Sequence, residues 1–124
     1  MKLVPVLALS LAATASAAAN APTSVVPIQL YSYGYNPNPI VLRAGHPVTL
    51  VFKDVSGSGH EFKAPEFFHA AKIVSGQFDE EGSIELKAHQ SMSVTLVPAR
   101  GTYHVHCGHF FHDQLGMHSW LYVQ

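Results

Sequence analysis

The segment from Cys107 to Met117 places a thiol, an imidazole and a thioether within eleven residues, between two stretches that alternate like β-strands. On an α-helix, at about 100° per residue, the side chains of Cys107, His112 and Met117 would fan apart and could not meet. Gly108 and Gly116, near the two ends of the segment, permit a loop that turns these side chains inward. The sequence therefore predicts a strand, a loop and a second strand here.

Period-two alternation of apolar and polar residues continues through much of the chain. The clearest example is the run Met92, Val94 and Leu96, which alternates with serine and threonine. Short strands separated by turn residues predict an antiparallel sandwich or barrel. One helix is expected at residues 65–72, because Pro65 stands at its first position, where proline is favoured. The other expected strands fall at residues 26–30, 40–42, 48–52, 84–86, 102–107 and 117–123.

The first residues read as a targeting signal. Lys2 is followed by an apolar stretch that is too short to span a bilayer. Small residues come next, with an A-x-A cleavage pattern around Ser16. We therefore expect residues 1–19 to be a secretory signal peptide and residues 20–124 to be one exported, periplasmic domain. A retained membrane anchor is the alternative, but no second apolar stretch supports a stable membrane span in the mature chain.

Cysteine usage and charge narrow the class of protein. An exported chain meets oxidising conditions, yet this chain has one cysteine, which cannot form an internal disulfide. Cys107 is therefore a free thiol, an intermolecular partner or a metal ligand, and nine histidines point toward metal. Without Lys2, six basic side chains face eight acidic ones, a formal charge of −2. No basic stripe predicts binding to nucleic acid.

The donor types favour one metal. Two imidazoles, one thiolate and a weak axial thioether form the ligand set of a mononuclear electron-transfer copper site. Zinc accepts imidazole and thiolate but gains little from a thioether. Iron–sulfur clusters need several cysteines, so they are excluded. The sequence thus predicts one copper ion that is held as both Cu(I) and Cu(II).

With these motifs in view, the chain resembles the cupredoxins, the family of small blue, type 1 copper proteins that includes plastocyanin and azurin. The run Ser58-Gly-His-Glu-Phe looks like the family's first histidine motif, and Gly101 to Met117 looks like its copper loop. The resemblance implies an all-β fold, a Greek-key β-sandwich over residues 20–124. It also implies that His60, Cys107 and His112 are the equatorial copper ligands and Met117 is the axial one.

One residue departs from the family pattern. Many cupredoxins follow the first ligand histidine with asparagine, whose hydrogen bonds tie the two ligand loops together, whereas Glu61 follows His60 here. An ionised carboxylate cannot donate hydrogen bonds. We therefore expect the thiolate to be tuned differently in this chain.

Other histidines compete for the ligand positions. His109 lies only two residues after Cys107, where strand geometry points it away from a shared ion, so His112 is preferred. His60 competes with His46, in a turn, and His69, on the expected helix. Alternation places His104 and His106 on the strand face opposite Cys107. A second, weaker copper site built from surplus histidines stays open, among His89, His104, His106 and His118.

These features predict a non-enzyme, expected to be monomeric, that carries single electrons between periplasmic redox partner proteins. The alternative is copper handling, as a chaperone, scavenger or tolerance protein that meets copper-trafficking proteins and uses the extra histidines. Large apolar residues of the loop, with two aromatic residues of the expected helix nearby, either cover the metal and seal the core or form an apolar patch for docking a redox partner: Phe110, Phe111 and Leu115, then Phe67 and Phe68.

Overall fold

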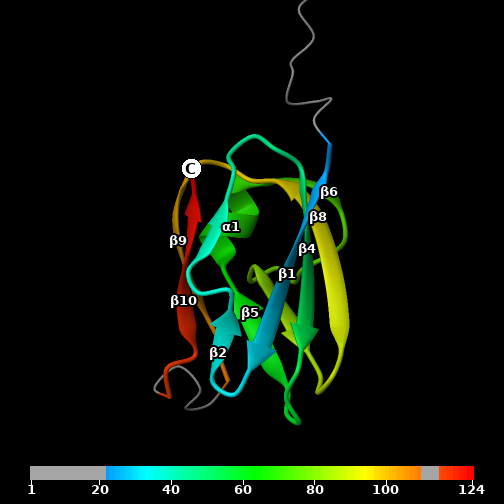
Figure 1. Ribbon diagram of the computed structural model, residues 1–124, viewed down its shortest axis with the longest axis vertical. Helices are drawn as coiled ribbons and strands as arrows, with labels where there is room; N and C mark the ends of the chain where they lie inside the picture. The colour runs from blue at the N-terminus through cyan, green and yellow to red at the C-terminus, as the bar shows by residue number, and fades with distance from the viewer. Residues whose placement is uncertain (1–21, 110–114) are drawn as a thin grey trace, which may run out of the picture.

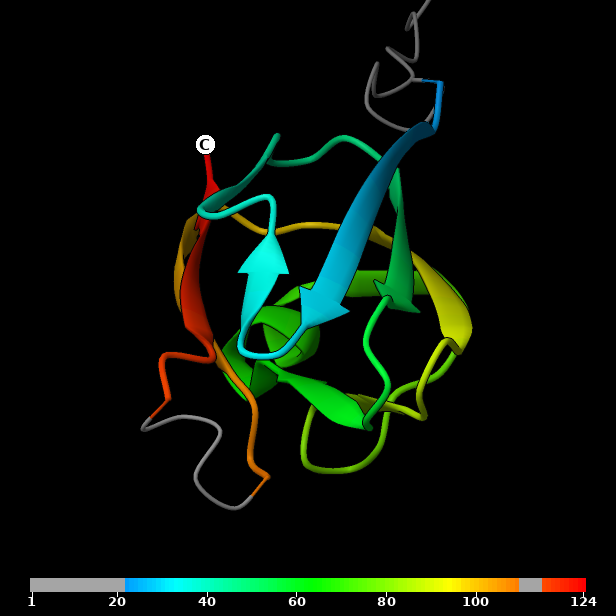
Figure 2. The ribbon, with the colours of Figure 1, turned by 60° about the horizontal axis from the view of Figure 1, so that its bottom comes forward.

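Two five-stranded sheets pack face to face in the computed structural model, which describes residues 22–109 and 115–124 (Figure 1). One sheet has the strand order β2-β1-β4-β8-β6, with bounds Gly34–Asn36, Ser24–Tyr31, Val48–Asp54, Ser91–Val97 and Lys72–Ser75. The other has the order β3-β10-β9-β5-β7, with bounds Ile40–Leu42, His118–Val123, Gly101–His106, His60–Lys63 and Ser83–Leu86. The sheets curl around a common interior (Figure 2), so the predicted all-β sandwich is confirmed.

The interior is filled by the residues that alternation assigned to it. Phe62 lies at its centre and makes ring contacts with Phe52, Tyr35 and Phe68, at centroid distances of 4.8, 5.6 and 6.0 Å. Burying an aromatic side chain of this kind stabilises the fold by about 1.5–3 kcal/mol. The inward faces of the predicted strands supply most of the remaining buried core, including Ile28, Leu30, Leu50, Ile84, Val94, Leu96, Val105, Leu121 and Val123.

Strand pairing differs from the expected antiparallel arrangement at two places. Strand β1 runs parallel to β4, and β3 runs parallel to β10. Three short strands, β2, β5 and β6, were also not predicted. Strand β2 has only three residues and β5 only four, and β6 is mostly exposed and shows no alternation.

The single helix among the described residues is shorter than predicted. Helix α1 spans Pro65–Ala70, with proline in its first turn as expected. It does not reach Lys72, because Ala71 is extended, with φ −79° and ψ 153°, and Lys72 opens β6 opposite Val97 of β8. No helix in the described part of the chain is both long and apolar enough to cross a bilayer.

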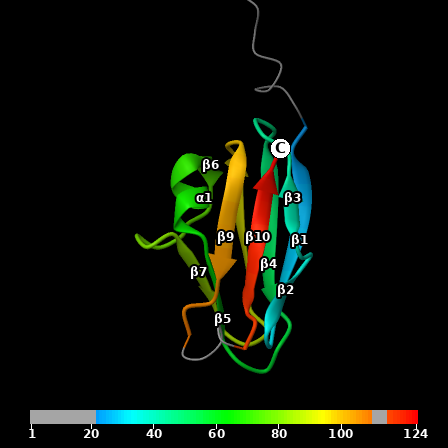
Figure 3. The same ribbon diagram turned by 90° about the vertical axis from the view of Figure 1, so that its left-hand side faces the viewer.

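Three chain segments converge at one end of the sandwich. Strand β5 begins there at His60, β9 ends there at His106, and β10 starts back from there at His118 (Figures 1 and 3). The C-terminus lies at the opposite end, where Gln124 accepts a hydrogen bond from the Ala44 amide at 2.8 Å. The residues on either side of the Cys107–Met117 segment are therefore held by paired strands beside the start of β5.

Candidate metal centre

His60, Cys107 and Met117 all lie inside the sandwich at this end. Each side chain is fully buried, with 0% relative exposure. The Cys107 amide donates a hydrogen bond to the Met117 carbonyl at 3.1 Å, which brings the two ends of the loop together. Strands β5 and β9 are neighbours in the sheet, with Lys63 opposite His106. Three of the four predicted ligands are thus buried, on segments that meet at this end of the sandwich.

The ring of His60 is oriented by its neighbours. Its Nε2 atom lies 2.8 Å from Ser32 Oγ and 3.4 Å from Ser58 Oγ. Tyr33 packs against the ring edge-on, with centroids 6.2 Å apart and planes at 85°. A histidine whose one ring nitrogen is held by a polar partner presents the other nitrogen in a fixed direction. Ser32 and Tyr33 reach His60 from the loop after β1, and no pattern in the sequence points to either residue.

Burial and hydrogen bonding act against each other at the sulfur of Cys107. Burial raises the pKa of the Cys107 thiol above its ordinary value, because a thiolate is poorly solvated there. Backbone N–H groups of His109 and Glu61 donate toward the sulfur and lower the pKa in part. Donors that point at a buried sulfur favour the thiolate, the form that binds metal. Burial is the larger of the two effects, so without a cation nearby the neutral thiol is the favoured form.

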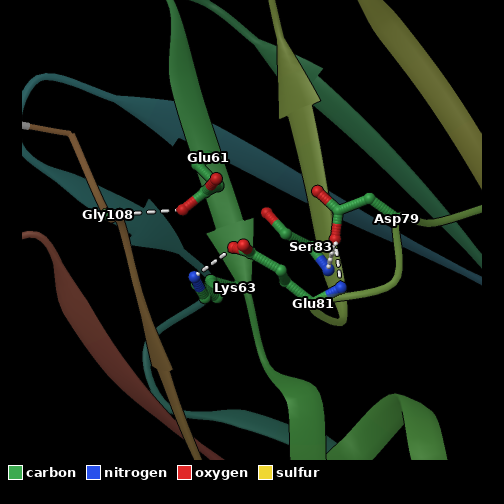
Figure 4. Close-up of polar contacts among 6 residues, drawn as sticks. All are labelled: Glu61, Lys63, Asp79, Glu81, Ser83 and Gly108. Carbon is green, nitrogen blue, oxygen red and sulfur yellow. Dashed lines mark hydrogen bonds and ion pairs between the residues drawn. The ribbon is translucent and has the colours of Figure 1, made fainter.

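Glu61 links the two ligand-bearing segments by accepting a hydrogen bond. Its Oε1 atom receives the Gly108 amide at 2.9 Å (Figure 4). Next along β5, Lys63 makes an ion pair with Glu81 at 2.8 Å. The sequence suggested that a carboxylate would alter the inter-loop hydrogen bonding because it cannot donate. The structure shows that Glu61 still links the two segments through a hydrogen bond, in which the loop amide of Gly108 is the donor.

The fourth predicted ligand, His112, lies outside the described residues, as do Phe110 and Phe111 of the candidate docking patch. Its competitor His109 is half-buried, and its Nε2 atom lies 3.0 Å from Glu85 Oε1. In the docking patch, Leu115 is 56% exposed.

The other residues weighed against these lie elsewhere. His46 lies in a turn at the far end of the sandwich, where the Gly45 amide donates a hydrogen bond to the Pro98 carbonyl. The Nδ1 atom of His46 lies 3.0 Å from the Ala44 carbonyl oxygen. His69 is exposed on α1. Phe67 and Phe68 are buried in the core, which agrees with the alternative that they seal it and takes them out of the docking patch.

The donor set fits a soft metal better than a hard one. Within residues 22–109 and 115–124, no three His, Cys, Asp or Glu side chains are grouped to hold one ion. The buried donors here are instead an imidazole, a thiol and a thioether, from His60, Cys107 and Met117. Thioether and thiolate select soft ions such as Cu(I), while imidazole suits both copper states.

A family comparison agrees with this fold and donor set. Residues 3–118 match the model of the cupredoxin-like domain. The chain belongs to the cupredoxin-like family. No curated protein matches the chain.

Solved structures show the same fold at low sequence identity. A reduced auracyanin from Roseiflexus castenholzii is 21% identical, with a TM-score of 0.60 over 84% of this chain and 98% of its own. Auracyanin A, a "blue" copper protein from Chloroflexus aurantiacus, is 19% identical, with a TM-score of 0.59 over 83% and 100%. The McoA multicopper oxidase from Aquifex aeolicus is 14% identical, with a TM-score of 0.61 over 82% of this chain but 29% of its own. The cupredoxin fold thus occurs both in small copper proteins and within larger oxidases.

Proposed function

We propose that this chain is an exported type 1 copper protein that carries single electrons between periplasmic redox partners. The observation that supports it best is the buried Cys107 thiol, which receives backbone N–H groups from both ligand-bearing segments. The Cys107 amide is also hydrogen-bonded to the carbonyl of Met117, whose side chain is buried too. Such a site keeps the sulfur away from solvent, and a bound cation would compensate for the burial of a thiolate there. The chain's likeness to the auracyanin structures adds support for a small electron carrier.

In this proposal each residue has a distinct part. Copper, when bound, supplies a one-electron Cu(I)/Cu(II) couple. Cys107 would provide the strong sulfur donor, and His60 would provide an imidazole nitrogen. His112 would provide the second imidazole and Met117 the weak thioether donor. The ring of His109 already contacts Glu85, which supports His112 rather than His109 as the second imidazole ligand.

The paired strands on both sides of the site limit how far its donors can move. Cys107 and Met117 are joined by a backbone hydrogen bond, Gly108 is tied to Glu61, and His60 is held by Ser32. A donor set that barely rearranges between two oxidation states lets an electron pass without a large structural change. No substrate pocket or acid–base pair is needed for that work, so we propose that the protein is not an enzyme.

Export belongs to the proposal as well. Residues 1–19 would direct the chain across the membrane and be removed, leaving residues 20–124 in the periplasm, which we expect to be monomeric. Mass spectrometry of the protein recovered from the periplasm tests this directly. A mature start near Asn20 is expected, whereas an intact residue 1 on the recovered chain would contradict it.

The test of the metal site is the visible and electron-spin spectrum of the copper-loaded protein. We expect an intense thiolate-to-copper absorption that disappears on reduction and returns on oxidation. Cys107→Ser should abolish this absorption, and His109→Ala should leave it intact. A copper-loaded wild-type protein without the absorption would overturn the proposal, and its loss in His109→Ala would show that His109, not His112, is the ligand.

Copper handling remains the second candidate, because three histidines gather on the outer face of β9 and β10. It predicts two or more copper ions that a chelator removes readily. The carrier predicts one tightly held copper that cycles reversibly. Stoichiometry measured before and after chelator treatment separates the two, while redox cycling of the retained copper reports on the carrier alone.

A further inference from the structure

A triangle of imidazoles lies on the outer face of the second sheet, away from Cys107. Strands β9 and β10 pair antiparallel with His106 directly opposite His118, and His104 stands two residues before His106 on the same face. Side chains directly opposite have Cβ atoms about 4.5–5.5 Å apart, and diagonal or i, i+2 neighbours about 7 Å. As they stand, the three side chains are not grouped to hold one ion, but these Cβ spacings allow three imidazoles to reach one ion after their rings rotate. Figure 3 views the molecule from the side on which β9 and β10 lie.

The rings already lie near one another. His104 and His106 are stacked, with centroids 5.4 Å apart and planes at 15°. His104 and His118 are 6.0 Å apart at 39°. Stacked rings do not aim their nitrogens at a common point, so a bound ion requires ring rotation. His104 and His118 are exposed and can turn about their side-chain bonds without disturbing the core.

A second observation points to a missing partner at this place. The Nδ1 atom of His106 is buried and makes no hydrogen bond within the described residues. A buried polar atom without a partner is costly, by about 1–3 kcal/mol, and usually marks an unseen water or ion. His106 is therefore the member of the triangle that gains most from a metal or from turning toward one.

Strand alternation separates this cluster from the proposed inner site. His106 precedes Cys107 and His118 follows Met117, so in each pair one side chain points out and the other points in. The inner donors are two sulfurs and an imidazole, whereas the outer donors are imidazoles alone. Imidazole suits Cu²⁺, Ni²⁺ and Zn²⁺.

We propose that His104, His106 and His118 form a second, surface metal site that binds one divalent transition-metal ion through three imidazoles. Three protein ligands leave further coordination positions for water or another donor. An ion held so openly exchanges with solvent faster than one buried at Cys107. The proposal does not depend on copper binding at the inner site.

The sole tryptophan of the chain offers a direct readout. Trp120 lies next to His104, with ring centroids 5.1 Å apart. We would titrate Ni²⁺, a paramagnetic quencher, into the copper-loaded chain and follow Trp120 fluorescence. Saturable quenching with one equivalent is expected. His104→Gln and His118→Gln should each weaken binding at least ten-fold, while His69→Gln, at an exposed histidine on α1, should leave it unchanged.

A parallel titration uses Cys107→Ser, which removes the inner thiolate. The same quenching curve is expected there, because the outer histidines are intact. Absence of saturable quenching in the wild type, or curves for His104→Gln and His118→Gln that match the wild type, would overturn the outer site. Loss of Ni²⁺ binding in Cys107→Ser would also overturn it, since the ion would then have occupied the inner site. Circular dichroism of each variant establishes that the fold is kept.

Discussion

The inner and outer faces of β9 and β10 carry adjacent residues with opposite chemistry. The inner face presents Val105, Leu121 and Val123 and leads at each strand's end into Cys107 and Met117, all of them buried. The outer face presents the histidine triangle and Trp120, which is 46% exposed. The difference shows how one pair of strands can serve a dry sulfur-containing site and a wet imidazole cluster, because a shift of one residue changes the face.

The inner face should dominate stability. Leu121→Ala removes a fully buried side chain and should lower the free energy of unfolding by about 3 kcal/mol, through lost burial and the cavity left behind. Its neighbour Trp120→Ala should lower it by less than about 1 kcal/mol, because the indole is half in water. Urea unfolding of the metal-free protein, followed by circular dichroism, measures both. Equal losses would mean that the outer face is packed rather than open.

The redox potential should respond to the inner face alone. Met117→Gln replaces a weak thioether with an amide oxygen, which favours Cu(II), so the potential should fall. His118→Gln, one residue further on, should change it several-fold less, because that side chain points outward. Spectroelectrochemical titration of the copper-loaded variants measures both potentials. An unchanged potential in Met117→Gln would remove Met117 from the site.

The sequence predicted which residues face inward much better than it predicted how strands pair. Alternation alone found the buried face of β1, β4, β8, β9 and β10, because one side of each strand is dry. It could not find the parallel pairing of β1 with β4. That pairing brings together residues far apart in the sequence, such as Ser24 and Val48, and leaves no local pattern. It also missed β6, whose exposed residues show no period.

The candidate site divides in a similar way. The types and order of Cys107 and Met117 suggested a metal site, and the side chains of both residues are buried, as is that of His60. The positions of Ser32 and Glu61 around it could not be predicted. Ser32 reaches His60 from 28 residues away, and Glu61 reaches Gly108 from 47. Such contacts depend on how two loops pack against each other, which the sequence pattern does not show. The types of ligand residue depend on the metal, so they can be recognised in the sequence. The choice of His112 stays a prediction.

Substitutions of Glu61 should have a moderate effect on stability. They should show whether its hydrogen-bond acceptor or its negative charge matters. Glu61→Ala removes the acceptor for the Gly108 amide and should lower the free energy of unfolding by about 1 kcal/mol, since water can replace part of the bond. Glu61→Gln keeps a side-chain oxygen and should lose less. Glu80→Gln, at an exposed residue away from the loop, is the control and should change stability by a few tenths of a kcal/mol at most.

For Glu61 the measurement is urea unfolding of the metal-free protein, with the visible spectrum of the copper-loaded variants as a second readout. If the tie positions Cys107, Glu61→Ala should shift the thiolate-to-copper band, and Glu61→Gln should restore its position. A band unmoved in both variants would limit Glu61 to a structural part. A loss in Glu61→Gln as large as that in Glu61→Ala would show that the negative charge, not the hydrogen bond, matters.

The smallest effect belongs to the exposed ion pair of Lys63 with Glu81 on the outer side of β5 (Figure 4). The hydrogen bond and charge of Lys63 hold the pKa of Glu81 below its ordinary value of 4.5, and Glu81 raises the pKa of Lys63 above 10.5. A carboxyl whose pKa is lowered in the folded state stabilises the fold at pH values above its unfolded-state pKa. That contribution is lost as the pH falls through the folded-state pKa. The contribution of Lys63 is present below pH 10.5 and is lost as the pH rises through its raised folded-state pKa.

Wild type and Glu81→Gln should therefore differ slightly in stability near pH 7 and converge as the pH falls well below 4.5. A difference that persists at pH 2, or grows with added salt, would mean that Glu81 acts through packing rather than charge, because a surface pair is weakened by salt.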